Sequence, residues 1–286
     1  MFTPFSVYQT VDDIVPLLDD DANLVLPLCE NIIFLMKKVL DPYKEECVSF
    51  TRNDATVVGM FAKIQEMAKE SLAAYKANNN TIAPLFYRIE YEAYIKMRYL
   101  ILHGESAQLA YRLASYKARY KAYQQYIKNP NAVAKVMADK FLADLDDEGF
   151  LLSDIANNEV KAFDGKNVRQ LMTEIGEEKI YDSVYGISSD IIHTDWGETR
   201  QFYLFGDKER MVYRFEPIKL HYRVAIGYAQ LNIQASELYF DWLDKNGLKE
   251  AKVLSELLEE FNRVLKLICQ HILNTYSASP DTYMRN

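Results

Sequence analysis

Cysteine, glycine and proline are all scarce in this chain, and each scarcity excludes a class of protein. Of its 286 residues, three are cysteines, ten are glycines and eight are prolines. Cys29, Cys47 and Cys269 lie far apart and form no Cys-x-x-Cys pair. This argues for a reducing compartment and against both a disulfide framework and a thiolate zinc site. Few glycines and prolines disfavour an all-β chain, which needs many turns, and favour long helices.

The chain also lacks the features of a membrane or exported protein. Its longest apolar run, around Ile32 to Met36, is far shorter than the roughly 20 residues that span a bilayer. Asp12 and Asp13 follow closely after Met1, where a signal peptide carries basic and then apolar residues. We therefore expect a cytoplasmic protein that makes no contact with a membrane.

Apolar residues recur every three or four positions, which is the helical period. This spacing predicts helices over 24–40, from Asp54 through the seventies, and over 81–103. The helix over 81–103 is apolar on two faces, so it should lie at the centre of a bundle. Gly104 should end it, and a basic helix should follow over 106–128.

The last third of the chain predicts two hairpins of different kinds. Two short runs rich in aromatic residues within 201–215 flank a turn that starts at Gly206, which indicates a β-hairpin. Two apolar-patterned helices follow around the Asn246-Gly247 turn and predict a C-terminal αα-hairpin. The expected fold is thus an all-α multi-helix bundle with a short β-hairpin. We expect one helical domain over 1–286, with N-terminal helices in 1–80, a core in 81–200 and the helical hairpin in 218–278.

One candidate site is a row of polar residues that recurs every four positions from Tyr181. Tyr185, Ser189 and His193 continue the row, and Asp190 lies three residues before His193 on the same side of a helix. A histidine beside a carboxylate can act as a general base or a proton donor near neutral pH. The structural alternative is a buried histidine with hydrogen bonds and tyrosine rings packed as core.

A second candidate is the pair Arg88 and Glu92, one turn apart on the apolar helix over 81–103. Charges in such a stripe have to be paired, because an unpaired buried ion is very costly. An arginine held inward by a glutamate can bind an anionic ligand such as phosphate. The alternative is an ion pair that only fixes the register of the helix.

A third candidate is the basic helix over 106–128, which predicts contact with single-stranded nucleic acid. From Ser106 to Ala138 there is no acidic residue and a charge of +6, whereas the whole chain carries −8. Cations for phosphates and rings for base stacking are what single-stranded nucleic acid requires. The alternative is a solvated helix face, or one paired with the acidic remainder of the chain. The cations are Arg112, Lys117, Arg119, Lys121 and Lys128, with Tyr116, Tyr120, Tyr123 and Tyr126 between them.

Metal and cofactor sites are not expected. The run from Asp144 to Gly149 resembles the start of a calcium loop, but its twelfth position is Ile155, where a bidentate glutamate is needed. No phosphate loop, dinucleotide fingerprint or Gly-x-Ser-x-Gly elbow occurs. His103, at a helix end just before Gly104, is explained by the helix dipole.

The Arg88-x3-Glu92 step and the later Ser189-x3-His193 step together resemble a bacterial all-helical family of unknown function. That family is similar in outline to the HEPN superfamily, whose active members are ribonucleases of toxin–antitoxin and phage-defence systems. The likeness covers roughly 81–243 and makes 81–200 a HEPN-like core. HEPN nucleases carry Arg-x4–6-His on one helix, whereas positions 187–189 before His193 are Ile-Ser-Ser. The resemblance then requires Arg88 or Arg200 to supply the cation, or the nuclease site has been lost.

The resemblance implies an RNA-directed effector of a bacterial toxin or phage-defence system. His193 is then the acid–base group, Arg88 stabilises phosphate charge, and Glu92 orients Arg88. Ser189, Tyr185 and Asp190 complete the pocket, and the basic helix holds the RNA. The resemblance also implies a homodimer and a protein partner such as an antitoxin or defence component. The rival interpretation is a non-enzymatic helical scaffold or a sensor of a small ligand.

Overall fold

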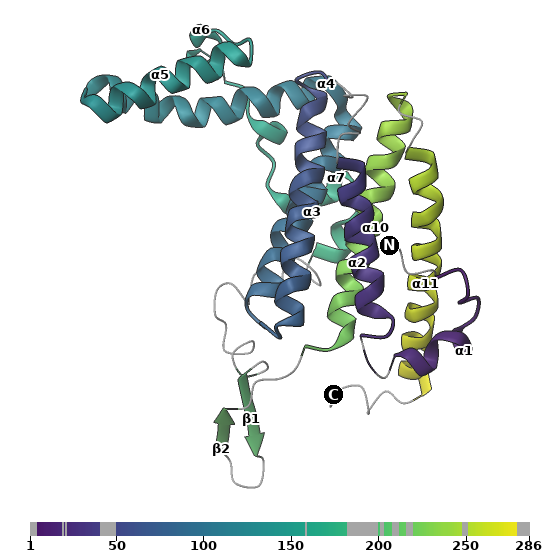
Figure 1. The fold of residues 1–286 in the computed structure, drawn as a ribbon. Helices are drawn as coiled ribbons and strands as arrows, with labels where there is room; N and C mark the ends of the chain where they lie inside the picture. The colour runs from purple at the N-terminus through teal and green to yellow at the C-terminus, as the bar shows by residue number, and fades with distance from the viewer. Residues whose placement is uncertain are drawn as a thin grey trace. The chain divides into compact units, whose positions relative to one another are not determined.

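The structure, a computed structural model, consists mainly of α-helices (Figure 1). It describes residues 5–18, 20, 22–40, 50–157, 159–181, 200, 203–207, 212–215, 220–247 and 251–278. The chain divides into two compact units. Unit 1 comprises Met1–Glu46, Phe61–Tyr94 and Asp182–Asn286, and unit 2 comprises Cys47–Met60 and Ile95–Tyr181.

Unit 1 is built around long helices with apolar faces. Its N-terminal elements are α1 (Val11–Ile14), η1 (Val15–Leu17) and α2 (Val25–Leu40). It then takes the later part of α3 (Asp54–Lys76) and the first part of α4 (Ile82–Lys128). Its C-terminal elements are β1 (Leu204–Asp207), β2 (Val212–Phe215), α10 (Tyr222–Lys245) and α11 (Ala251–Ala278). In Figure 1, α2, α10 and α11 lie side by side.

The core of unit 1 is formed by the apolar stripes that the helical period predicted. Phe61 of α3 stacks on Tyr239 of α10, with ring centroids 4.0 Å apart. Phe5 packs edge-on against Phe261 of α11 at 5.7 Å. Burial of such rings removes large apolar areas from water and stabilises the unit. The buried side chains of α2 include Leu28, Ile32, Leu35 and Met36.

Both predicted hairpins are confirmed, but Gly206 and Asp207, which were predicted to begin the β-turn, are paired residues of β1. β1 and β2 pair antiparallel, with Leu204 opposite Phe215 and Asp207 opposite Val212. α10 and α11 pack against each other as the C-terminal αα-hairpin (Figure 1). α10 begins after His221, whose Nδ1 accepts a hydrogen bond from the Arg223 amide at 3.2 Å. The fold class is therefore all-α with one short β-hairpin, as the sequence predicted.

Unit 2 contains the first part of α3, the rest of α4 and a series of shorter helices. These are α5 (Ala132–Asp147), α6 (Leu152–Ala156), η2 (Ala162–Gly165), α7 (Val168–Glu174) and η3 (Glu178–Ile180). Asparagine side chains cap two of them: Asn131 accepts from the Ala134 amide and Asn167 from the Gln170 amide. Such caps satisfy amide groups that have no partner in the first helical turn.

Helix α4 breaks at Gly104, where the sequence predicted a helix end. Gly104 has φ +63° and ψ −149°, a combination that is essentially restricted to glycine. His103 is thus the last residue before the break, and the basic helix begins just after it. The prediction of two successive helices separated by Gly104 is confirmed.

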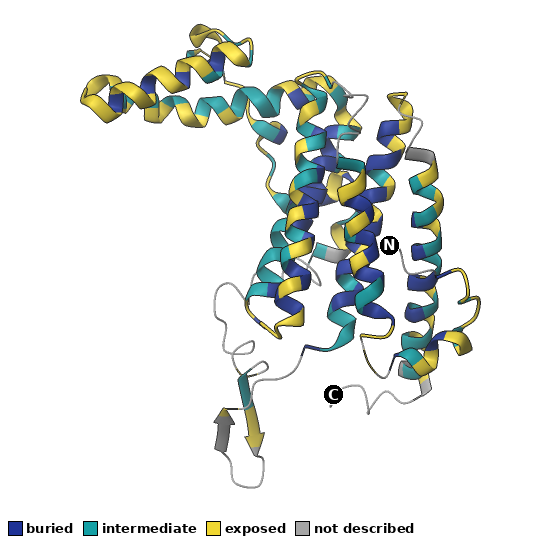
Figure 2. Cartoon of the chain, viewed as in Figure 1, coloured by how far each residue is buried: buried dark blue, intermediate teal, exposed yellow. Residues whose placement is uncertain are grey.

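The tyrosines of the basic helix take part in the packing of unit 2. Phe141 and Leu145 of α5, together with Ile155, are buried, and part-buried residues of α4 pack against them. The Tyr123 ring lies 5.0 Å from the Phe141 ring, and the Tyr116 ring lies 5.9 Å from that of Phe150. Exposed positions nevertheless alternate with these along α4 and α5, as Figure 2 shows. These tyrosines therefore stabilise the α4–α5 pair, whatever else they contact.

No helix among the described residues is long and apolar enough to cross a bilayer. The single domain over 1–286 stays a prediction. Two of the boundaries between the units, at 60/61 and 94/95, fall inside α3 and α4.

Candidate functional site

The structure describes only some of the residues that were predicted to form a catalytic pocket. Tyr185, Ser189, Asp190 and His193 lie outside the described residues. Arg88 and Glu92 are half-buried on α4, within unit 1. The predicted convergence of Arg88, Glu92 and His193 therefore stays a prediction.

Between Arg88 and Glu92 lies a residue that the sequence interpretation overlooked. Glu90 is fully buried in unit 1, and neither of its carboxyl oxygens has a hydrogen-bond partner among the described residues. Burial raises the pKa of Glu90 well above its usual value, while the nearby Ser71 hydroxyl opposes the shift only in part. Burial therefore favours the neutral carboxylic acid form of Glu90.

Other weakly acidic groups lie around Glu90 in the interior of unit 1. Burial is the main cause that raises the pKa of the Cys29 thiol to about 12, followed by the charge of Glu30. Burial is also the main cause that raises the pKa of Tyr87 and of Tyr228. All these groups are held in their neutral forms. This cluster is a dry polar interior rather than a set of reactive anions.

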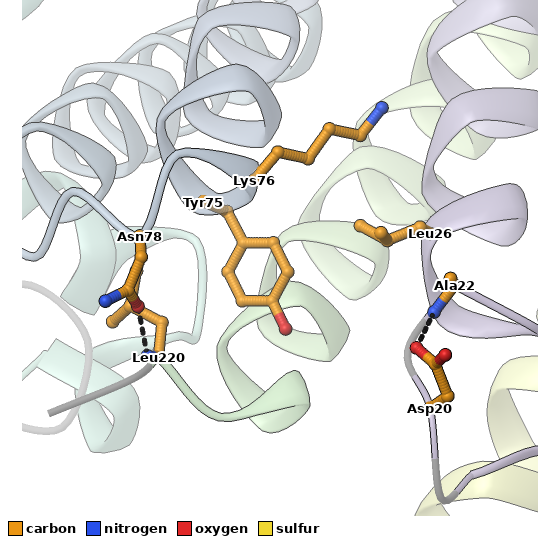
Figure 3. A pocket seen from close by; sticks show the side chains of 7 residues that line it. All are labelled: Asp20, Ala22, Leu26, Tyr75, Lys76, Asn78 and Leu220. Carbon is orange, nitrogen blue, oxygen red and sulfur yellow. Dashed lines mark hydrogen bonds between the residues drawn. The ribbon is translucent and has the colours of Figure 1, made fainter.

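Unit 1 also carries a small pocket at its surface, drawn in Figure 3. Its volume is about 180 Å³, and the Tyr75 hydroxyl points into it. Asn78, at the end of α3, accepts a hydrogen bond from the Leu220 amide at 2.6 Å and so closes one side. The pocket combines a carboxylate and an ammonium group with an apolar wall. Its lining residues are Asp20, Ala22, Leu26, Tyr75, Lys76, Asn78 and Leu220.

Arg112, predicted to bind RNA, joins three segments of unit 2. Its Nε donates to Glu148 at 2.9 Å and its Nη1 to the Asn53 side chain at 2.7 Å. Its Nη2 donates to the Glu148 carbonyl at 3.0 Å, and its side chain is only 11% exposed. The guanidinium also lies 4.8 Å from the centroid of the Phe150 ring. Arg112 therefore stabilises unit 2 through these contacts.

Two further cations of the basic helix also contact unit 2. Lys117 donates to the Ile155 and Ala156 carbonyls at 3.1 and 2.8 Å, at the C-terminus of α6. Arg119 forms an ion pair with Asp144, from the segment that resembles a calcium loop. Lys121 and Lys128 are exposed and form no ion pair with another described residue. Of the five cations predicted to bind nucleic acid, Lys121 and Lys128 are therefore the two that we still expect to do so.

His103 has a carboxylate partner that the helix-dipole explanation omitted. Its Nε2 lies 2.8 Å from Oε1 of Glu174, at the end of α7. The Tyr99 ring, one turn earlier on α4, lies 4.2 Å from the imidazole. The His103 side chain is 36% exposed, so the imidazole is both held in place and reachable from solvent.

Arg98 contacts the same short segment of unit 2. Its Nη1 forms an ion pair with Glu177, and its Nη2 donates to the Ile175 carbonyl at 3.1 Å. The His103 imidazole contacts Glu174, which is one residue before Ile175. The guanidinium and the imidazole therefore both reach the chain between Glu174 and Glu177. The side chain of Arg98 is 34% exposed.

Lys166 links Glu174 to two further polar groups. Its ammonium donates to Oε2 of Glu174 at 2.7 Å, to Asp164 at 3.2 Å and to the Tyr99 hydroxyl at 3.4 Å. The Tyr99 hydroxyl itself donates to Asp164 at 2.7 Å. The hydrogen bond to Glu174 is the main cause that raises the pKa of Lys166. The hydrogen bond from Tyr99 is the main cause that lowers the pKa of Asp164.

The backbone that carries Asp164 is left-handed over three successive residues. Phe163 and Asp164 have φ of +53° and +54°, and Gly165 has φ of +75°. Non-glycine residues avoid this region, at a cost of roughly 1–2 kcal/mol each. The buried Phe163 ring packs against Tyr99 and Tyr111, at 5.6 and 5.2 Å, which holds the turn in place. Strained backbone of this kind is concentrated at functional sites.

These contacts define a second candidate site, which the sequence interpretation missed although a signal for it was present. Arg98 and His103 have the Arg-x4-His spacing that HEPN nucleases carry on one helix. Positions 187–189 before His193 lack the arginine of this spacing, whereas Arg98 precedes His103 by five residues. The partners Glu174, Lys166 and Asp164 follow no motif, so only the fold identifies them.

In the described part of this mainly helical chain, Arg98 and His103 thus both contact the segment from Glu174 to Glu177. The chain belongs to the family described as "Family of unknown function (DUF5677)", whose model matches residues 54–211. The matched range contains Arg88 and Glu92, the Tyr181–His193 segment and the whole of the Arg98–His103 site. Comparison with curated proteins found no match, and comparison with solved structures found none either.

Proposed function

We propose that this protein is a HEPN-like ribonuclease, an RNA-directed effector of a bacterial toxin or phage-defence system. The observation that carries the proposal is the arrangement of Arg98 and His103. They have the required spacing on α4, and both side chains reach the segment from Glu174 to Glu177. RNA, a second copy of the chain and an antitoxin or defence component are its proposed partners.

The proposed reaction uses the 2′-hydroxyl of RNA as its nucleophile, a group that DNA lacks. His103 accepts the hydroxyl proton as the 2′-oxygen bonds to phosphorus and the bond to the 5′-oxygen breaks. A proton returned to the 5′-oxygen completes the step, which is general acid–base catalysis. Arg98 leaves its ion pair with Glu177 and binds the phosphate oxygens instead. Its guanidinium then stabilises the negative charge that develops on these oxygens.

Lys121 and Lys128 are the proposed contacts to the RNA backbone. Both are exposed, and they lie two turns apart on the same side of α4. If they bind phosphates, RNA affinity falls steeply as salt rises, and Lys121→Glu with Lys128→Glu reduces that dependence. Lys140→Glu, an exposed lysine of α5, is the matched control.

The test of the proposal is degradation of a single-stranded RNA by purified wild-type and variant proteins. Loss of an acid–base group lowers a rate by about 10²–10⁴-fold, so we expect this loss in His103→Ala. Arg98→Ala should lose a similar factor. His271→Ala, a histidine of α11 in unit 1, is the control and should keep full activity. Unchanged melting temperatures are required for all three variants.

The same experiment distinguishes the Arg98–His103 site from a second proposed location of the active site. In that alternative His193 and Arg88 act, with Glu92 orienting Arg88 and Ser189, Tyr185 and Asp190 completing the pocket. His193→Ala and Arg88→Ala then abolish cleavage, and His103→Ala does not. If the wild-type protein degrades no RNA, or if His103→Ala and His193→Ala both retain full activity, the proposal is wrong.

A non-enzymatic sensor is the rival proposal, and the pocket of Figure 3 favours it. Asp20 gives this pocket a carboxylate, which suits a small ligand with an amino group, whereas the Lys76 ammonium is paired with Glu30. The probe is a set of free amino acids, added singly while the melting temperature of the protein is measured. Bound ligand raises the melting temperature, and Tyr75→Phe should weaken that rise. If none of the set has any effect, this rival is excluded.

A further inference from the structure

We propose that Lys166 is a positioning residue that holds Glu174 against His103 and thereby makes Nδ1 of His103 the proton-transferring atom. This inference rests on the proposed function, because it concerns the same site. It adds a residue that lies outside the Arg-x4-His spacing. It also assigns a role to the left-handed turn before Lys166.

The first support is that the two carboxylate oxygens of Glu174 contact two different partners. Oε1 is 2.8 Å from Nε2 of His103, and Oε2 is 2.7 Å from the Lys166 ammonium. A carboxylate bound at both oxygens cannot rotate away from either partner. Because Nε2 is directed at a carboxylate, it carries the proton of the neutral imidazole. Nδ1 is then the basic nitrogen that accepts a proton from substrate.

The second support is that Lys166 is itself held from three directions. Its three donor positions are directed to Glu174, Asp164 and the Tyr99 hydroxyl. Tyr99 in turn packs its ring against the imidazole of His103. The imidazole is therefore located by Glu174 at one edge and by Tyr99 at one face. Both of these groups are tied to Lys166.

The third support is the strained turn over residues 163–165. A relaxed turn would connect α6 to α7 without two non-glycine residues at positive φ. The left-handed conformation places Asp164 where it accepts from both Tyr99 and Lys166. Phe163 anchors the turn in the interior of unit 2. Such strain persists only where the surrounding structure imposes it, and here it maintains the contacts of Lys166.

The charged and titratable groups around His103 give the inference a measurable sign. They are Tyr99 on α4, Asp164 and Lys166 from the turn, and Glu174 on α7. Removing the Lys166 cation leaves the Glu174 charge unopposed, which favours protonated His103 and moves its titration midpoint up. Removing the Glu174 charge does the reverse. The two changes should have opposite signs.

The experiment is an NMR titration of the imidazole carbon-bound protons, combined with pH profiles of RNA cleavage. The chain has four histidines, so His103→Gln identifies the signal of His103. We expect the midpoint to rise in Lys166→Met and to fall in Glu174→Gln. The pH profile of cleavage should shift with it, and Lys166→Met should cleave about 10-fold more slowly, as a misplaced base does. Lys166→Arg should restore both properties.

Lys179→Met is the matched control, because Lys179 is an exposed lysine of unit 2 that follows α7. It should change neither the midpoint nor the profile. The inference is overturned if Lys166→Met and Glu174→Gln shift the midpoint in the same direction or not at all. A slower Lys166→Met protein with an unaltered pH profile would also overturn it, since that result indicates a purely structural role.

The two proposals can fail separately. If the wild-type protein cleaves no RNA while the two midpoints still move in opposite directions, the proposed function is wrong and the positioning role stands. If RNA is cleaved through His103 but the midpoints do not move, the positioning role is wrong and the proposed function stands. Should Lys166→Met fail to fold, Glu174→Gln and Lys166→Arg still decide between these outcomes.

Discussion

Unit 1 and unit 2 stabilise their polar side chains in opposite ways. In unit 1 Glu90 is fully buried and has no described hydrogen-bond partner, and burial raises its pKa, which favours its neutral form. In unit 2 Arg112, Arg119 and Lys166 remain partly exposed, and each faces a carboxylate. In a dry interior, protonation costs less than a buried charge, whereas near solvent a charge is retained and paired. Among the described residues, unit 2 therefore holds a set of paired ions around His103.

The largest expected effect tests whether stability in unit 1 depends on apolar packing. Phe61→Ala removes a buried ring that stacks on Tyr239, and should lower the free energy of unfolding by about 3–5 kcal/mol. Urea denaturation followed by the fluorescence of Trp242, which packs on Tyr239, measures this. Val253→Ala on α11, where the valine is 64% exposed, is the control and should change little. Equal losses in both variants would contradict the assigned core.

The next effect tests the neutral state of Glu90. Its pKa is raised in the folded protein, so above its ordinary value of 4.5 the folded state binds more protons than the unfolded chain. Its contribution to stability is complete below about pH 4.5 and is lost as the pH rises, by at most about 1.4 kcal/mol per pH unit. Glu90→Gln should remove this loss, so its gain in stability over wild type should be larger at pH 8 than at pH 5.

Denaturation of wild type and Glu90→Gln at pH 5 and pH 8 measures the difference. Glu92→Gln, two residues further along α4 and only half-buried, is the control. A variant less stable than wild type at pH 8 would mean that Glu90 is ionised and paired. The contrast between the two units would then be lost.

A smaller change in stability is expected from substitutions that test the break in α4 at Gly104. This break places His103 at the end of a helix. Gly104→Ala places a side chain at φ +63° and ψ −149°, and should lower stability by about 2 kcal/mol. Gly59→Ala, on α3 in the same unit, should instead raise stability by about 0.5–1 kcal/mol. Thermal denaturation by circular dichroism measures both. Opposite signs are expected, and a stabilising Gly104→Ala would mean that α4 is continuous.

The smallest effect tests the paired ions of unit 2. Arg112→Met leaves Glu148 and Asn53 without their partner, and should cost about 1–2 kcal/mol. Lys121→Met, two turns further along α4 and exposed, should cost nothing measurable. Hydrogen exchange of the α5 and α6 amides locates the loss within unit 2. If both variants behave alike, Arg112 is a surface cation like Lys121.

Local pattern was sufficient to predict most of the helices and both hairpins. The apolar period, Gly104, the Asn246-Gly247 turn and the two runs within 201–215 are interactions of near neighbours, so each can be read from a short window. The left-handed turn at Phe163 could not be predicted. Its conformation is imposed by rings from a distant helix, against the preference of the residues themselves.

The candidate site was predictable in one respect and not in others. Arg98 and His103 have a spacing that a systematic search of α4 would have found. Glu90 and Glu92 are both glutamates in one apolar helix, and the sequence does not say which is buried without a partner. Of the five predicted RNA-binding cations, Arg112, Lys117 and Arg119 have partners 25 to 59 residues away, which no short window reveals.

The sequence by itself determined the all-helical class, the positions of the breaks and the presence of an arginine and a histidine at a nuclease-like spacing, because these follow from neighbouring residues. Only the tertiary structure decided which charges are neutralised and which remain as ions. It also decided that Lys166 and Glu174 stand beside His103. Burial and pairing depend on segments that meet only when the chain has folded, and those segments set the local dielectric and the partners of each charge.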